Sequence, residues 1–253
     1  MKIKTDREIA CIKEGGHLLH AILQELLSEV KEGITTGELD RLAHEKIRAC
    51  GGKPSFFQYG GEKGNPFPGA LCTSLNEEVV HGIPKKDRLI RAGDIVSLDI
   101  GMWYKGLATD MARTVVVGPV SSDISRLVEV TRVSLDAGIE AIRPGATIRD
   151  FARAVEAVAK QEGLGVVRDL VGHGVGHEVH EPPQIANYVG GASRERFEVG
   201  MVVALEPMFT LGDWRVDVLE DGWTFVTADH SLSAHFEDTV AVTSDGAEIL
   251  TRP

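Results

Sequence analysis

The chain has 253 residues, of which 43% are hydrophobic, 26% charged and 6% aromatic, and its formal net charge is −11. This composition excludes a disordered chain, no apolar run approaches the ~18 residues of a membrane-spanning helix, and the charged N-terminus lacks the pattern of a signal peptide. The acidic balance disfavours contact with phosphate backbones, so we expect neither a membrane nor a specific nucleic acid as a partner.

The first predicted helix begins at Thr5. Thr5 and Glu8 have the spacing of a capping box, and apolar residues then recur at helical spacing. Gly15 and Gly16 are expected to weaken the middle of this helix, because glycine has a low helix propensity.

A second helix is predicted after Gly33, where Thr35 and Glu38 form another capping box, and it ends near residues 51–52. The later elements follow in chain order: a Gly-, Pro- and aromatic-rich loop at 53–70, strands near 70–80 and 94–104, a hairpin turn at Lys105–Gly106 into 107–117, helices at about 122–142 and 147–163, and mostly extended structure from 166 to 251. No linker or low-complexity tract interrupts the chain, so residues 1–253 are predicted to form a single domain.

Four segments of the first half recur in the same order in the second half. The matching pairs are 31–35 with 143–147, 80–84 with 179–183, 93–99 with 200–206, and the acid–Thr–Val segments that begin at Asp110 and Glu237. The order helix, histidine, carboxylate, carboxylate therefore occurs twice. Two similar halves that face each other would bring these groups to one central site.

The four acids of this repeat carry the strongest functional signal. Asp99 and Glu206 each interrupt an apolar strand pattern, and an ionised carboxylate in apolar surroundings is costly unless it is paired or bound to a cation. Exposure on an edge strand or pairing with a basic side chain would explain either acid alone, and Asp110 and Glu237 alone would be surface acids. Together the four acids match the charge of two divalent cations. Carboxylates with one imidazole suit Mn, Fe, Co or Zn, which activate a bound water near neutral pH.

Three histidines, His173, His177 and His180, lie close together in a segment rich in glycine and proline. The zincin spacing H-E-x-x-H is absent, and the glycines and prolines oppose a helix, so a strand is more plausible. A regular strand would place His180 on the face opposite His173, although the glycines could bend it. A solvated histidine loop is the alternative, and the sequence leaves the roles of His230 and His235 open. Serine-hydrolase, P-loop and Rossmann signatures are absent, and Cys72 as a nucleophile has little support.

These residues resemble the type I methionine aminopeptidases of the pita-bread metallopeptidase superfamily. The resemblance spans nearly the whole chain and rests on 76–84, the strand ending at Asp99, 109–110, 172–176 with 180–184, 205–207, and 236–240. It implies an α/β (α+β) pita-bread fold of two pseudo-symmetric halves, with a curved, mainly antiparallel sheet covered by helices.

The resemblance also implies the roles of the site residues. Two divalent ions, of Co, Mn, Fe or Zn, are expected on Asp99, Asp110, His173, Glu206 and Glu237. The implied catalytic residues are Glu206 as general base, His180 at the scissile carbonyl, and His81 near the departing amide nitrogen. The methionine pocket is expected to be lined by Cys72, Phe67 and Trp223, with Tyr59 as a further candidate.

The implied activity is removal of the initiator methionine from nascent proteins and peptides, by attack of a metal-activated hydroxide on the first peptide bond. The N-termini of nascent polypeptides and peptides would be the substrates, and transient contact with the ribosome is a further expected interaction. The widely spaced Cys11, Cys50 and Cys72 predict no disulfide framework, so a reducing, cytoplasmic location is expected. The chain is also expected to be a monomer. Two alternatives stay open. One is an Xaa-Pro aminopeptidase or dipeptidase of the same fold, which residues 110–114 resemble, and the other is a non-catalytic pita-bread protein that binds RNA or a protein partner.

Overall fold

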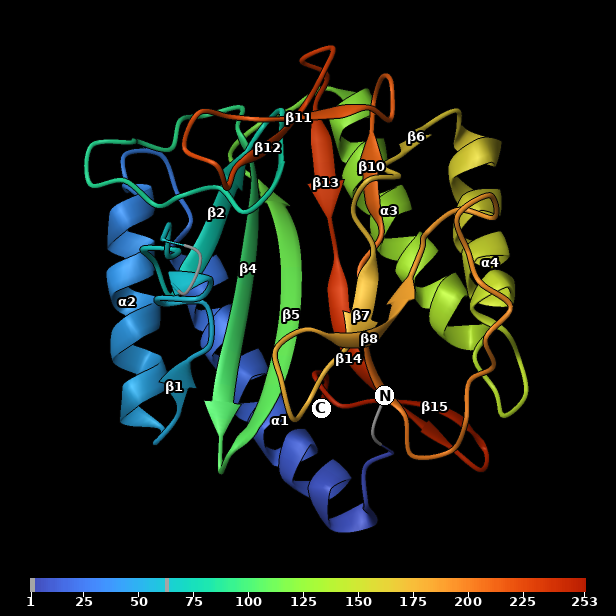
Figure 1. The fold of residues 1–253 in the computed structure, drawn as a ribbon. Coiled ribbons are helices and arrows are strands. Elements are labelled where there is room, and N and C mark those ends of the chain that lie inside the picture. The colour runs from blue at the N-terminus through green and yellow to red at the C-terminus, as the bar shows by residue number, and fades with distance from the viewer. Residues whose placement is uncertain (1–2, 62–63) are drawn as a thin grey trace.

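The computed structural model describes residues 3–61 and 64–253 (Figure 1). Met1 and Lys2 of the charged N-terminus, and residues 62–63 of the predicted loop, therefore lie outside the described residues. Within the described ranges, no helix is long and apolar enough to cross a membrane.

The helices and strands largely follow the predicted order. The helices are α1 (Asp6–Glu29), α2 (Thr36–Ala49), α3 (Ser122–Glu140) and α4 (Ile148–Glu162). The strands before α3 are β1 (Lys53–Pro54), β2 (Leu71–Leu75), β3 (Glu78–Val80), β4 (Ile95–Tyr104) and β5 (Leu107–Val116). Those after α4 are β6 (Gly165–Val166), β7 (Gly172–Gly174), β8 (Glu181–Ile185), β9 (Val202–Leu205), β10 (Met208–Thr210), β11 (Val216–Val218), β12 (Phe225–Thr227), β13 (Ser233–His235), β14 (Glu237–Thr243) and β15 (Gly246–Ile249).

Both predicted capping boxes are present. The Thr5 hydroxyl accepts from the backbone N–H of Glu8, and the Glu8 carboxylate accepts from the backbone of Thr5; Thr35 and Glu38 do the same at α2. These contacts satisfy N–H groups that have no partner inside the helix, so the start of each helix is encoded within four residues.

One nine-stranded antiparallel sheet joins the two halves. Its order is β1-β4-β5-β14-β9-β7-β8, with β2 paired to β4 and β15 to β14. The halves meet where β14 pairs with β5, at Glu237 opposite Ala112. Helices α1 and α2 pack their apolar side chains against β2, β4 and β5, while α3 and α4 share a second core with β9, β13 and β14. In Figure 1, α2 flanks the strands on the left, α1 runs behind β4 and β5, and α3 and α4 lie on the right. Each half of the sheet is therefore covered by its own pair of helices, in agreement with the predicted pita-bread architecture.

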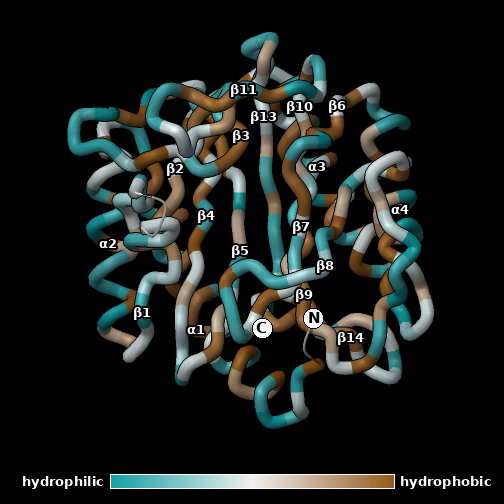
Figure 2. The backbone as a smooth tube through the Cα atoms, in the orientation of Figure 1, coloured by the Kyte–Doolittle hydropathy of each residue, from teal (hydrophilic) through white to brown (hydrophobic). Residues whose placement is uncertain are grey.

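The helices that cover the sheet are amphipathic. Along α2 and α4, hydrophobic and hydrophilic stretches alternate in Figure 2, and each helix buries one apolar face, with Leu39 and Ile47 in α2 and Phe151 and Val155 in α4. Burial of that stripe, rather than helix propensity, holds each helix on the sheet.

The glycine pair in α1 does not interrupt the helix. A Cβ on Gly16 would lie 2.2 Å from the carbonyl oxygen of Leu250, and a Cβ on Gly15 would lie 3.1 Å from the side-chain Cβ of Tyr104. The glycines therefore allow α1 to approach β4 and the segment after β15 closely, and this packing compensates for their low helix propensity.

Candidate metal centre and substrate pocket

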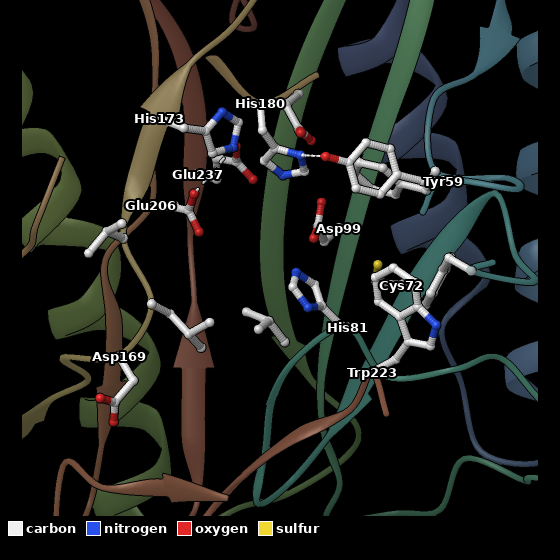
Figure 3. Close-up of a pocket in the computed structure, with 16 residues that line it drawn as sticks. Tyr59, Cys72, His81, Asp99, Asp169, His173, His180, Glu206, Trp223 and Glu237 are labelled. Atoms are coloured by element: carbon white, nitrogen blue, oxygen red, sulfur yellow. Dashed lines mark hydrogen bonds and ion pairs between the residues drawn. The ribbon is translucent and has the colours of Figure 1, made fainter. Parts of the chain in front are cut away.

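The four predicted acids reach one cavity from the strands at the junction of the two halves. Asp99 lies in the middle of β4, opposite Ala112 of β5, and Asp110 lies on β5, opposite Gly101 of β4. Glu237 begins β14 and also pairs with Ala112, across the junction. Glu206 directly follows β9, the next strand of the sheet. The sheet register thus brings together acids that are far apart in the sequence (Figure 3).

His173 completes this acidic cluster. One ligand atom each from Asp110, His173 and Glu237 lie within 4.8 Å of one another, and the His173 Nε2 lies 3.4 Å from the Glu206 Oε1. The His173 Nδ1 lies 3.0 Å from the Gly174 carbonyl oxygen, which can only accept, so Nδ1 carries the proton. Nε2 is then left with a free lone pair that points toward the acids, as a metal-ligating imidazole requires.

The raised pKa values of the four acids show that a negative charge is unfavourable in this cavity. Burial raises the pKa of Asp99 to about 7. Burial, and then the neighbouring carboxylates, also raise the pKa values of Asp110, Glu206 and Glu237. One side-chain oxygen each of Asp99, Asp110 and Glu237 is buried without a hydrogen-bond partner among the described residues. Unpaired, mutually repelling acids of this kind fit divalent cations, which would supply the missing partners and charge.

The histidines of the cavity are held neutral. Burial, and then neighbouring imidazoles, lower the pKa of His173 to about 3 and that of His81 to about 4. Burial also lowers the pKa of His180 to about 4. Neutral imidazoles can ligate a cation or donate a single N–H to a substrate without adding repulsion between the protein and a metal.

The segment that carries the histidines bends rather than running as a regular strand. β7 ends at Gly174, and residues 176–180 form bends before β8 begins at Glu181. The rings of His173 and His180 consequently lie 4.3 Å apart on the same side, facing the cavity. The opposite-face arrangement of a regular strand is therefore wrong for this segment. His177 instead contacts Glu8 of α1, with 2.7 Å between Nε2 and Oε1.

The cavity has a volume of about 240 Å³ and is aromatic on the side away from His173. All the predicted pocket residues line it, namely Tyr59, Phe67, Cys72 and Trp223, together with His81 and His180. Phe67 and Trp223 pack edge to face at 5.4 Å, and His81 lies between Trp223 and Phe225. Cys72 is opposite Asp99 in the β2–β4 register, and burial raises the pKa of its thiol, so it is a neutral wall residue.

Sequence reasoning missed several residues of the site. Phe56, Val80, Asp169, Leu170 and Val171 also line the cavity, and Figure 3 places Asp169 at its margin, away from the metal cluster. His235, whose role was open, is buried with its Nε2 4.0 Å from the Glu237 Oε2. The sequence did carry one signal for His235: it lies two positions before Glu237, and residues two apart on an extended chain point to the same side.

The comparisons agree with this geometry. The model of metallopeptidase family M24 matches residues 10–244. The chain is 46% identical over 254 residues to a methionine aminopeptidase of Treponema pallidum, with 100% of this chain and 97% of the relative covered. The crystal structure of methionine aminopeptidase from Thermotoga maritima matches with a TM-score of 0.95 and 42% identity over 100% of both chains. An Xaa-Pro dipeptidase from Bacillus anthracis matches less closely, with a TM-score of 0.78 and 26% identity over 99% of this chain and 62% of that one.

The family and the acidic cluster together support the use of divalent metal. The greater likeness to methionine aminopeptidases than to the Xaa-Pro dipeptidase holds for both sequence and structure. The chain therefore belongs to metallopeptidase family M24 and, within it, to the methionine aminopeptidases, which are metal-dependent hydrolases.

Proposed function

We propose that this chain removes the N-terminal methionine from peptides and nascent proteins, using two divalent ions. The observation that carries the proposal is the meeting of three buried acids, the partly buried Glu206 and the neutral His173 on one wall of a cavity whose opposite wall is aromatic. The ions would be held by Asp99, Asp110, His173, Glu206 and Glu237, whose four carboxylates match the charge of two dications. Their identity among Co, Mn, Fe and Zn depends on availability as well as affinity.

Bound ions would supply Lewis acidity at the first peptide carbonyl and acidify a water so that it can act as the nucleophile at neutral pH. Glu206 would accept the proton of the attacking water and return it to the departing amide nitrogen. The neutral His180 would donate its Nε2–H to the carbonyl oxygen as negative charge develops there, and His81 would assist at the leaving nitrogen.

The aromatic wall would provide the specificity for methionine. Phe67 and Trp223 meet edge to face, and Cys72 closes the strand side of the pocket. A polarizable thioether packs well against aromatic edges and a thiol, whereas a β-branched side chain would not reach along a narrow pocket. The proposal places the reaction in the cytoplasm, in keeping with three free cysteines. It treats the chain as one catalytic domain, since both halves contribute ligands.

A peptide panel tests the proposal. The protein is stripped with a chelator, reconstituted with Mn²⁺, Fe²⁺, Co²⁺ or Zn²⁺ in turn, and assayed on Met-Ala-Ser and Ala-Pro-Ala. We expect activity only after metal is restored, with Met-Ala-Ser as the preferred peptide. Preference for Ala-Pro-Ala would assign the chain to the Xaa-Pro peptidases, and no hydrolysis with any ion would favour a non-catalytic binding protein. Activity that persists after complete metal removal would reject the metal mechanism.

A further inference from the structure

His235 is a buried histidine beside the acidic cluster that has no role in the proposed reaction. It ends β13, opposite Met208 of β10, and its side chain is 2% exposed. Its backbone N–H donates to the Thr114 hydroxyl over 3.0 Å, and the same hydroxyl donates to its carbonyl oxygen over 2.6 Å. These two hydrogen bonds fix the backbone of His235 to Thr114 of β5.

Within residues 3–61 and 64–253, the imidazole of His235 has no hydrogen-bond partner. Both ring nitrogens are buried and unpaired among the described residues. The Nε2 lies 3.8 Å from the Glu206 Oε2 and 4.0 Å from the Glu237 Oε2. These separations exceed a hydrogen bond, and they are too short for a bridging water, which needs about 5.5 Å between the two groups it joins. Because buried polar groups are normally paired, His235 is expected to gain a partner when the site is loaded.

Glu206 is the better placed of the two candidates. Its carboxylate lies between two imidazoles, with Oε1 3.4 Å from the His173 Nε2 and Oε2 3.8 Å from the His235 Nε2. His173 keeps its Nδ1 proton on the Gly174 carbonyl and therefore offers Nε2 as an acceptor. His235 is not constrained in this way, so its Nε2 can carry a proton. A small rotation of the Glu206 side chain would close the gap to Oε2 and leave Oε1 beside His173.

We propose that His235 is a positioning residue of the metal centre, and that its Nε2–H donates a hydrogen bond to Oε2 of Glu206. This inference rests on the proposed function, because it takes Glu206 as a metal ligand. The donated bond would hold the Glu206 carboxylate in one orientation, with Oε1 left beside His173 and available as a metal ligand, and would fix the group proposed to move the proton. Outer partners of this kind orient metal ligands, and their loss typically weakens metal binding by about 10–100-fold.

Three substitutions test this role. His235→Leu removes both ring nitrogens at similar bulk, His235→Gln retains an amide N–H near the place of Nε2, and His235→Asn places its amide near Nδ1 instead. His20→Leu is the matched control, because His20 on α1 also has a buried, unpaired ring nitrogen but does not line the cavity. The measurements are the Co²⁺ dissociation constant by titration calorimetry and the visible absorption spectrum of the Co²⁺-loaded protein, with circular dichroism to check folding.

We expect His235→Leu to weaken Co²⁺ binding by about 10–100-fold and to alter the spectrum, His235→Gln to restore both, and His20→Leu to leave both unchanged. Unchanged affinity and spectrum in His235→Leu would overturn the inference and make His235 an ordinary core residue. If His235→Leu does not fold, the Gln and Asn variants decide: weaker binding in Asn alone supports the inference, and equal binding in the two rejects it. If the wild-type protein binds no Co²⁺, or Glu206→Gln binds it as well as wild type, the proposed function fails rather than the role of His235.

Discussion

The Tyr59 hydroxyl lies 2.7 Å from Nδ1 of His180, and the two rings meet edge to face with centroids 5.0 Å apart (Figure 3). A phenol donates readily to a neutral imidazole nitrogen, so this contact favours the tautomer in which Nε2 of His180 carries the proton. That proton is the one His180 would donate to the substrate carbonyl. Tyr59, expected to line the methionine pocket, therefore also orients the ring of His180, the residue proposed to act at the carbonyl.

Tyr59→Phe tests this relationship, because it keeps the ring and removes only the hydroxyl. We expect kcat on Met-Ala-Ser to fall by roughly tenfold, about the contribution of one hydrogen bond, with little change in KM. Steady-state kinetics on the metal-loaded protein measure both constants. A raised KM with unchanged kcat would instead limit Tyr59 to the methionine pocket.

His180→Ala removes the proposed donor to the carbonyl oxygen itself. Loss of one such donor typically costs about 100-fold or more in kcat, since the interaction is strongest in the transition state. Metal content, measured by atomic emission, is expected to remain that of the wild type, because His180 is not among the proposed ligands. Normal turnover in this variant would refute the assigned role.

Glu237→Gln separates metal binding from folding. Glu237 is one of several buried acids whose charges repel one another, so the metal-free variant is expected to be at least as stable as the wild type. Its affinity for Mn²⁺ is expected to fall by more than the roughly 100-fold that loss of an outer partner costs. Glu248→Gln is the control, because Glu248 pairs with Lys13 at a half-exposed position. Equal Mn²⁺ affinity in the two variants would remove Glu237 from the ligand set.

The metal-free protein is expected to lose stability as the pH rises from 6.5 to 8. Burial raises the folded pKa of Asp99 from 3.8 to about 7, and burial together with neighbouring carboxylates raises the pKa values of Asp110, Glu206 and Glu237 well above their usual range, so the folded state holds protons that the unfolded chain has released. The contribution of Asp99 is lost up to about pH 7, and the other three acids extend the loss above it. Stability then falls with rising pH, by about 1.4 kcal/mol per pH unit for each retained proton. The buried histidines act in the opposite direction: burial lowers the folded pKa of His173 from 6.5 to about 3, so their contribution is lost only as pH falls below 6.5. Between pH 4 and 6.5 the acids lower the stability and the histidines raise it as the pH increases. Above pH 6.5 only the acids still change the stability.

Urea unfolding at pH 6.5 and pH 8, with and without Mn²⁺, measures this dependence. Bound Mn²⁺ favours the ionised carboxylates and should abolish or reverse the loss of stability. A metal-free protein that is equally stable at both pH values would show that the acids are already ionised in the fold.

Gly16→Ala tests the packing of α1. The added Cβ would lie 2.2 Å from the Leu250 carbonyl oxygen, which belongs to the backbone and cannot rotate away. We expect the free energy of unfolding to fall by about 1–3 kcal/mol, the usual cost of overpacking, despite the higher helix propensity of alanine. The control is Ala21→Gly on the exposed face of α1, which should lower the free energy of unfolding by only about 1 kcal/mol through helix propensity. Gly33→Ala does not serve as a control, because the φ of Gly33 is +90° and alanine would be strained there. A more stable Gly16→Ala protein would show that α1 can shift away from Leu250.

Local signals in the sequence were enough to predict where the first two helices begin and which acids lie in the cavity. The capping boxes at Thr5 and Thr35 involve residues only three positions apart, so no distant contact was needed to predict them. Asp99 and Glu206 were conspicuous because a charge within an apolar strand needs a partner wherever the strand lies. The repeat then indicated that the two halves would face each other.

Tertiary structure alone decided how the site is assembled. The bend that brings His180 beside His173, the tolerance of Gly16 in α1, the Tyr59–His180 contact and the approach of His235 to Glu206 all join residues far apart in the chain, or depend on such neighbours. Periodicity reports only which face of an element a side chain occupies. Which atoms meet across elements depends on strand register and close packing, and these are set by the whole fold at once.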